Sequence, residues 1–204
     1  MRIKIITFFF LTTVIVACQQ TDKQSDSQTD TTTVAQEPLT EEEKQQYKEQ
    51  GQKIALSVFT ELSGQLQQAL QEGGVPQAIE HCNLVAMPLV DSLSKVYQAD
   101  IKRTSLKVRN PEDAPTAEER DLLQNYAATK AEGGALEPVV LRQGKDIAFY
   151  APIGIQPLCL KCHGTVGEDI AEADYETIKR LYPEDEAIGY QEGDLRGMWR
   201  ITFN

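Results

Sequence analysis

Hydrophobic side chains first recur at helical spacing after residue 40. Between residues 40 and 72 they return every three or four positions, until Gly73-Gly74 interrupts the pattern. Thr40 and Glu43 have the spacing of a capping box, in which each side chain hydrogen-bonds the other residue's backbone N–H. The pattern therefore predicts a long amphipathic helix that begins near Thr40 and ends at the two glycines.

A second amphipathic pattern follows the glycines. It begins at Pro76, which suits the first turn of a helix, and its apolar stripe includes Cys82. Pro88 lies inside this stretch, where proline removes a backbone donor and clashes with the preceding turn. We expect a second helix with a kink or a division at Pro88.

The remainder of the chain alternates between strand and helix signals. Residues 101–108 alternate loosely and predict a strand, and Thr116 with Glu119 predicts a capped helix that ends at Gly133-Gly134. Further signals predict a hairpin of residues 139–141 and 147–150 around Gln143-Gly144, a helix over 175–181 and a closing strand over 198–203. Helices followed by a meandering antiparallel sheet indicate an α+β domain.

The N-terminus has the pattern of an export signal. Arg2 and Lys4 precede an apolar run over residues 5–17, which is shorter than a helix needs to cross a bilayer. The run ends directly before Cys18 and resembles the lipobox of bacterial lipoproteins, in which this cysteine is lipidated. The alternative is an ordinary secretory signal with an incidental cysteine. In both cases residues 1–17 are expected to be a signal peptide, and the lipoprotein pattern predicts an exported protein anchored to a membrane of the bacterial cell envelope.

Composition sets the domain organisation and excludes one class of partner. Residues 18–39 are polar and predict a flexible tether, so the folded domain is expected to span residues 40–204. With 41% hydrophobic and 25% charged residues among 204, the chain suits one globular domain. Its 20 Lys and Arg against 31 Asp and Glu give a net charge of -11, which excludes a phosphate-neutralising nucleic-acid surface.

The chemistry of the chain is concentrated in Cys159-Leu160-Lys161-Cys162-His163. Two thiols three residues apart followed by histidine form the attachment pattern of a c-type haem, in which Cys159 and Cys162 bind the vinyl groups and His163 binds the iron. Two alternatives remain at this stage. Cys159 and Cys162 would form a disulfide, or they would join His163 and Cys82 in a Cys₃His zinc site.

Three segments resemble one known family. These are Ala78-Ile79-Glu80-His81-Cys82-Asn83, the run from Lys102 to Pro111, and Tyr150-Ala151-Pro152-Ile153 leading into the cysteine motif. Together they resemble the Tll-type c-haem domain family, long catalogued as a domain of unknown function. The resemblance covers about residues 45–204. It implies a PAS-like antiparallel sheet with N-terminal helices and one covalent haem c, and in that family the iron ligands map onto His163 and Cys82.

The residues alone leave the second iron ligand open. Candidates in the folded domain are Cys82, His81, Met87 and Met198, and an open site on the iron is the remaining alternative. His81 and Cys82 are neighbours, so on a helix their side chains point about 100° apart and only one can face a haem. Cys82 shares the apolar stripe and is favoured, although a free cysteine is also commonly a small buried hydrophobe.

Basic and aromatic residues supply candidates for the walls of the pocket. Arg103 and Arg109 are candidates to bind haem propionates, because arginine pairs well with carboxylates. Lys102 and Lys107 fit a solvated strand face better. Aromatic candidates for the pocket, with plain core packing as the alternative, are Phe149, Tyr150 and Trp199.

These features predict a non-enzymatic haem protein that transfers single electrons or holds a redox poise. Thiolate ligation by Cys82 would stabilise ferric iron and give a low midpoint potential. The partner is expected to be an unidentified redox protein. The alternative is a haem-based redox or gas sensor that acts through a separate partner protein.

Overall fold

The structure, a computed structural model, describes residues 37–203. The predicted signal peptide over 1–17, Cys18 and the tether as far as residue 36 lie outside the described residues. Leu39 is buried directly before the first helix, although the sequence placed it in the tether. Within the described range no helix has the length and apolarity that crossing a membrane requires.

Helix α1 (Glu41–Tyr97) consists of two helical halves separated at the predicted glycines. Gly73 (φ -153°, ψ 20°) and Gly74 (φ 69°, ψ -160°) leave helical geometry, and the positive φ of Gly74 is one that glycine adopts without steric cost. The predicted capping box of Thr40 and Glu43 is present. Pro88 does not divide the second half, because the two glycines are the residues of α1 with non-helical backbone angles.

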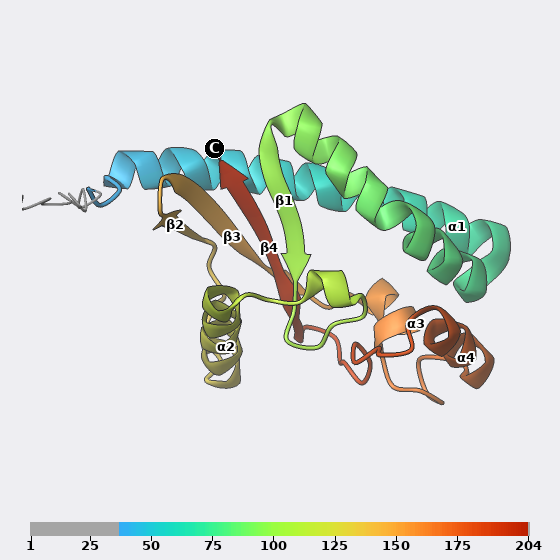
Figure 1. Ribbon diagram of the computed structural model, residues 1–204. Helices are drawn as coiled ribbons and strands as arrows, with labels where there is room; N and C mark the ends of the chain where they lie inside the picture. Colours follow the sequence, from blue (N-terminus) through green and yellow to red (C-terminus); the bar gives the residue numbers. More distant parts are fainter. Residues whose placement is uncertain (1–36, 204) are drawn as a thin grey trace, which may run out of the picture. The chain divides into compact units, whose positions relative to one another are not determined.

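The two halves of α1 fold back on each other as an antiparallel pair (Figure 1). The Tyr97 hydroxyl donates to Ser57 Oγ at 2.6 Å, and His81 Nε2 lies 3.3 Å from Gln65 Oε1. These contacts join residues 40 and 16 positions apart in the sequence. The helical hairpin therefore returns the chain to the sheet at Gln98, whose left-handed backbone (φ 51°, ψ 42°) ends the helix.

Four antiparallel strands form the sheet in the order β1-β4-β3-β2. They are β1 (Ala99–Thr104), β2 (Val139–Gln143), β3 (Asp146–Gly154) and β4 (Leu195–Phe203). The first strand begins and ends earlier than the predicted 101–108. Its end has a local cause, since Ser105 Oγ donates to Arg196 O at 2.6 Å and accepts from Lys107 N at 3.2 Å, which turns the chain out of the ladder.

The remaining helices are short. Helix α2 (Ala117–Ala131) has the predicted Thr116–Glu119 capping box, and α4 (Glu172–Leu181) begins three residues before the predicted helix. The cysteine motif lies on two single turns, η2 (Pro157–Cys159) and α3 (Leu160–His163), and η1 (Pro111–Asp113) follows β1. The predicted hairpin is formed by β2 and β3, with a loop of Gly144 and Lys145 between paired residues 143 and 146.

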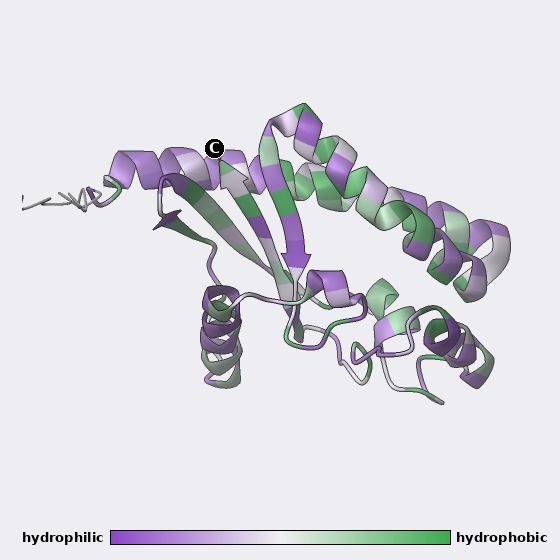
Figure 2. Ribbon diagram, in the orientation of Figure 1, coloured by the Kyte–Doolittle hydropathy of each residue, from purple (hydrophilic) through white to green (hydrophobic). Residues whose placement is uncertain are grey.

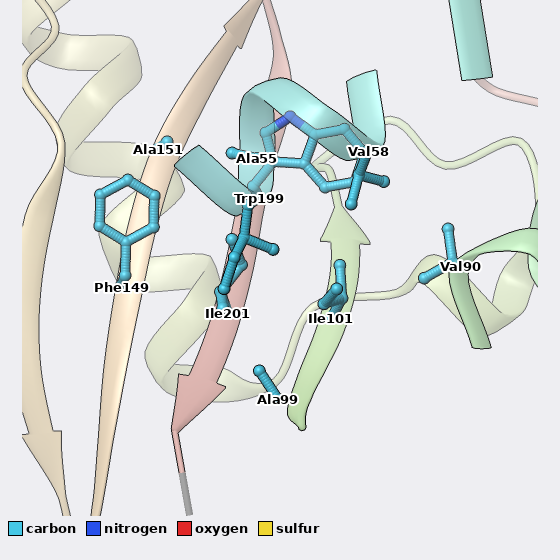
Figure 3. Packing of buried hydrophobic residues seen from close by; sticks show 10 residues of the cluster. Ala55, Val58, Val90, Ala99, Ile101, Phe149, Ala151, Trp199 and Ile201 are labelled. Carbon is cyan, nitrogen blue, oxygen red and sulfur yellow. The ribbon is translucent and has the colours of Figure 1, made fainter. Parts of the chain in front are cut away.

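Each face of the sheet has its own core. On one face α1 covers a cluster that includes Val58, Ile101, Phe149 and Trp199 (Figure 3). On the other face, Leu123 and Tyr126 of α2 pack against Ala148, Tyr150 and Met198 of the sheet. Successive residues of a strand point to opposite faces, which is why Phe149 and Tyr150 belong to different clusters.

One carboxylate is buried beside α2. Glu119 is 1% exposed, and its side chain bonds Lys102 Nζ at 3.0 Å and Arg200 Nη1 at 3.2 Å. It also accepts from the N–H of Thr116 at 2.8 Å. The pairing of a buried charge with two cations joins α2 to β1 and β4. Lys102 is therefore paired, where the sequence suggested a solvated lysine.

Candidate functional site

The cysteine motif is placed against the second half of α1. Cys162 is half-buried and packs in a cluster with Ile79 of α1 and Ile178 of α4. Cys159 accepts a hydrogen bond at Sγ from the N–H of Gln156, 3.4 Å away. Cys82, Cys159 and Cys162 are all free thiols, so the motif does not form a disulfide in the described part of the chain.

His163 is held in one tautomer. Its Nδ1 lies 2.7 Å from the carbonyl oxygen of Ala187, which can only accept, so Nδ1 carries the proton. Burial holds the pKa of His163 well below its usual value, and the nearby Arg109 lowers it further. The ring is therefore neutral with a lone pair on Nε2, which is the form in which histidine binds a metal.

The segment 185–190 forms a frame around His163. Tyr190 N donates to His163 O at 3.0 Å, and Gly189 N donates to Gly164 O at 2.8 Å. The Tyr190 ring stands perpendicular to the imidazole, with 6.3 Å between ring centroids. Main-chain bonds, the Nδ1 bond and ring packing together fix the orientation of the imidazole.

Arg109 ties this frame to the motif. Its Nε and Nη2 contact the two Asp185 carboxylate oxygens at 3.0 and 3.1 Å, and Nη2 also donates to Cys162 O at 2.6 Å and Ala187 O at 3.3 Å. The Asp185 side chain is 1% exposed. Arg109 therefore supports the protein framework around His163, whereas its predicted contact with a propionate stays a prediction.

Cys82 lies on the side of α1 that faces the motif. Burial raises the pKa of the Cys82 thiol, and Arg103 and Arg109 partly oppose that rise. Burial likewise raises the pKa of Cys162 to about 11. The charge of Arg109 lowers this pKa, and the Cys82 thiol raises it. Ile79, one helical turn before Cys82, packs in the same cluster as Cys162, which places Cys82 on the side of α1 toward the motif.

The other candidate ligands are placed less favourably. His81 points to Gln65 on the opposite half of the helical hairpin. Met198 is fully buried in the cluster beneath α2, on the sheet face away from α1. Met87 is half-buried more than one helical turn beyond Cys82. Cys82 lies one helical turn after Ile79, which packs with Cys162, and its role as an iron ligand stays a prediction.

Tyr150 lies on the sheet face away from α1. It is 1% exposed and packs with Leu123, Tyr126 and Met198 under α2. The physical reason is strand parity, because Tyr150 points to the face opposite Phe149 and Ala151. Of the three aromatic candidates, Phe149 and Trp199 lie on the α1 side, and the role of Tyr150 in a haem pocket stays a prediction.

An apolar groove lies between the first half of α1 and the ends of β3 and β4. It has a volume of about 420 Å³ and reaches Gln156, three residues before Cys159. Its lining residues include Leu56, Phe59, Phe149, Pro152, Ile153 and Trp199. Leu56 and Phe59 are exposed by 66% and 44%. The groove approaches the motif through Gln156, whose N–H donates to Cys159 Sγ, and its apolar walls suit a hydrophobic group better than a hydrated ion.

The zinc alternative lacks a site. Among residues 37–203 no three His, Cys, Asp or Glu side chains converge on a position where they could hold a metal ion. Cys82, Cys159, Cys162 and His163 are thus not arranged as the closed tetrahedron of a structural zinc site.

Comparison with known families gives an independent result. The family model for Tll0287-like proteins matches residues 17–204. The chain belongs to the Tll0287-like family. A solved structure of the cyanobacterial heme-protein Tll0287 is similar to it, with 23% identity, a TM-score of 0.49, and coverage of 73% of this chain and 94% of that one. No curated protein matches the chain.

Several residues around the motif of this Tll0287-like chain have no signal in the sequence. Asp185, Ala187 and Tyr190 follow the motif by more than 20 positions in an irregular segment. Ala187 acts through its carbonyl oxygen, which any residue possesses. The basic character of Arg109 pointed to an anionic partner, but nothing in the spacing indicated that this partner is Asp185.

Proposed function

We propose that this Tll0287-like protein carries one covalent haem c. Cys159 and Cys162 would hold its vinyl carbons as thioethers, His163 Nε2 would bind the iron on one side, and Cys82 would bind it on the other. The observation that carries the proposal is the bond from His163 Nδ1 to Ala187 O, which leaves Nε2 available within a Cys-x-x-Cys-His motif. Cys162 of this motif packs with Ile79, one helical turn before Cys82. The heme named for the solved relative supports the same assignment.

The function that fits this site best is single-electron transfer, or redox poise, at low potential. When bound, the haem supplies a one-electron iron couple, and an anionic sulfur ligand favours its ferric state. The chain's own residues orient the imidazole, keep it neutral and surround the motif with apolar groups. The sequence has two histidines, and the second one, His81, lies in hydrogen-bond contact with Gln65. His81 is therefore not placed as an acid or base for catalysis, and we propose electron transfer without bond-making chemistry.

The protein is proposed to work outside the cytoplasm. Residues 1–17 would direct export, and a lipid on Cys18 would anchor the domain to a membrane of the bacterial cell envelope through the polar segment that follows. C-type haem is attached outside the cytoplasm, which agrees with export. The redox partner would be another protein of the envelope.

Expression of the full chain together with a c-type haem maturation system tests the assignment. We expect one covalent haem per chain by pyridine haemochrome assay, and its loss when Cys159 and Cys162 are both changed to Ala. The ferric absorption spectrum should show thiolate charge transfer that disappears in Cys82→Ser. His81→Gln is the matched control on the adjacent helical position and should keep the spectrum.

Two results would redirect the proposal. A chain that holds no covalent haem under these conditions would refute the haem c assignment. A protein whose reduced form binds CO tightly, with the Cys82 ligand displaced, would favour the sensor alternative over electron transfer. Lipidation is tested separately, by incorporation of labelled palmitate into the wild-type chain and its absence in Cys18→Ala.

A further inference from the structure

Arginine side chains gather on one side of His163 in an otherwise acidic chain. Arg103 is the next-to-last residue of β1, Arg109 follows that strand, and Arg196 is the second residue of β4. Arg196 Cζ lies 5.6 Å from the centroid of the Tyr190 ring, and that ring packs edge-on against the His163 imidazole. In Figure 2, β1 changes from hydrophobic to hydrophilic toward the end that carries Arg103. With a net charge of -11 over the whole chain, this concentration of positive charge is not a general property of the surface.

Two of these arginines, Arg103 and Arg196, form no ion pair with a carboxylate among residues 37–203. Arg109 is paired with Asp185, whereas Arg103 has no hydrogen bond or ion pair with any residue in 37–203. Its Cζ lies 5.8 Å from the centroid of the Trp199 ring, its one aromatic contact in that range. Arg196 donates from Nη1 to Lys107 O at 3.0 Å, and that acceptor is an uncharged carbonyl.

The two arginines lie near each other at the adjacent ends of β1 and β4, because Thr104, which follows Arg103, pairs with Met198, two residues after Arg196. Burial lowers the pKa of Arg196, and the charges of Arg109 and Arg103 lower it further. Burial raises the pKa of the nearby Asp113 carboxyl, and the charges of Arg103 and Arg196 lower it. Partly buried like charges at short range are unfavourable, and a bound anion reduces that cost.

The surroundings of Arg103 indicate which anion this is. Trp199, over which Arg103 lies, also lines the apolar groove that reaches Gln156 near Cys159. A ligand that fills the groove and meets Arg103 therefore needs a flat apolar body and a carboxylate at its edge. The planar fork of an arginine donates two parallel hydrogen bonds to such a carboxylate.

We propose that Arg103 and Arg196 form a clasp for the propionate carboxylates of the haem, with Trp199 as the apolar floor beside it. This inference rests on the proposed haem c function and adds the residues that fix the orientation of the ring about the His163 axis. Arg103 and Arg196 are positioning residues, since they would bind the edge of the group rather than the iron.

Resonance Raman spectroscopy of the full-length holoprotein tests the clasp, because the propionate bending band reports hydrogen bonding to those carboxylates. We expect the band to shift in Arg103→Gln and in Arg196→Gln. Arg103→Lys, which keeps the charge but not the fork, should shift it less than Arg103→Gln. The matched control is Arg120→Gln, an equal charge change on the exposed side of α2, and it should leave the band in place.

Removal of either cation should also lower the midpoint potential, because a nearby positive charge disfavours ferric iron. Haem content is measured first, so that the two proposals fail separately. If both glutamine variants keep covalent haem and the wild-type propionate band, the clasp is wrong while the haem c assignment stands. If the wild-type chain takes up no haem, both proposals fall. If Arg103→Gln does not fold, the Arg196→Gln and Arg103→Lys spectra decide.

Discussion

The ion pair of Arg109 with Asp185 offers a sharp test of how the motif is held. Arg109 is 13% exposed and Asp185 1% exposed in their side chains, so Arg109→Met leaves a buried carboxylate without its counter-charge. Breaking a buried pair in this way costs about 3–5 kcal/mol of unfolding free energy. At roughly 2–4 °C per kcal/mol for a domain of this size, the unfolding temperature should fall by about 6–20 °C.

Thermal and urea unfolding followed by circular dichroism measure this loss. Asp185→Asn in the Arg109→Met background removes the orphaned charge and should recover part of the stability, with a coupling of about 1–3 kcal/mol in the double-mutant cycle. The control is Arg180→Met, which breaks an exposed pair with Glu80 and should cost at most about 1 kcal/mol. An Arg109→Met variant as stable as Arg180→Met would refute the reasoning.

Three further predictions concern the core. Gly51→Ala should destabilise the domain by about 1–3 kcal/mol, because an added Cβ would lie 2.2 Å from the Phe149 ring. Gly64→Ala is the control, because nothing lies within 4 Å of its added Cβ. This second change should stabilise the domain by about 0.4–1 kcal/mol. Urea titrations check both, and a stabilised Gly51→Ala would contradict the packing. Glu119→Gln should cost about 3 kcal/mol in the same assay by leaving two cations without their buried partner, and a loss below about 1 kcal/mol would be inconsistent with that pairing. Burial raises the pKa of Tyr126 from 10.0 to about 12, so the unfolded chain releases this proton first and the unfolding free energy should fall as pH rises through that interval. Tyr126→Phe should flatten this fall, and equal slopes for the two proteins would count against it.

Local sequence rules determined where the helices begin and break. The capping boxes at Thr40 and Thr116 are formed as predicted, and the chain reverses at Gly73-Gly74. These features depend on contacts within four residues or on backbone freedom at one residue, so the sequence contains all the information they need. The Cys159-x-x-Cys162-His163 spacing is likewise local, and it carried the haem prediction without any knowledge of the fold.

Only the tertiary structure decided which side chains meet the motif. Tyr150 is next to Phe149 in sequence yet lies on the opposite face of the sheet, because strand parity was set by the pairing of β3 with β4. The helical hairpin turns His81 toward Gln65, a contact that the sequence pattern did not indicate, while ligation by Cys82 stays a prediction. Asp185 and the carbonyl of Ala187 reach His163 from a distant irregular segment, and long-range contacts of that kind leave no periodic signal in a sequence.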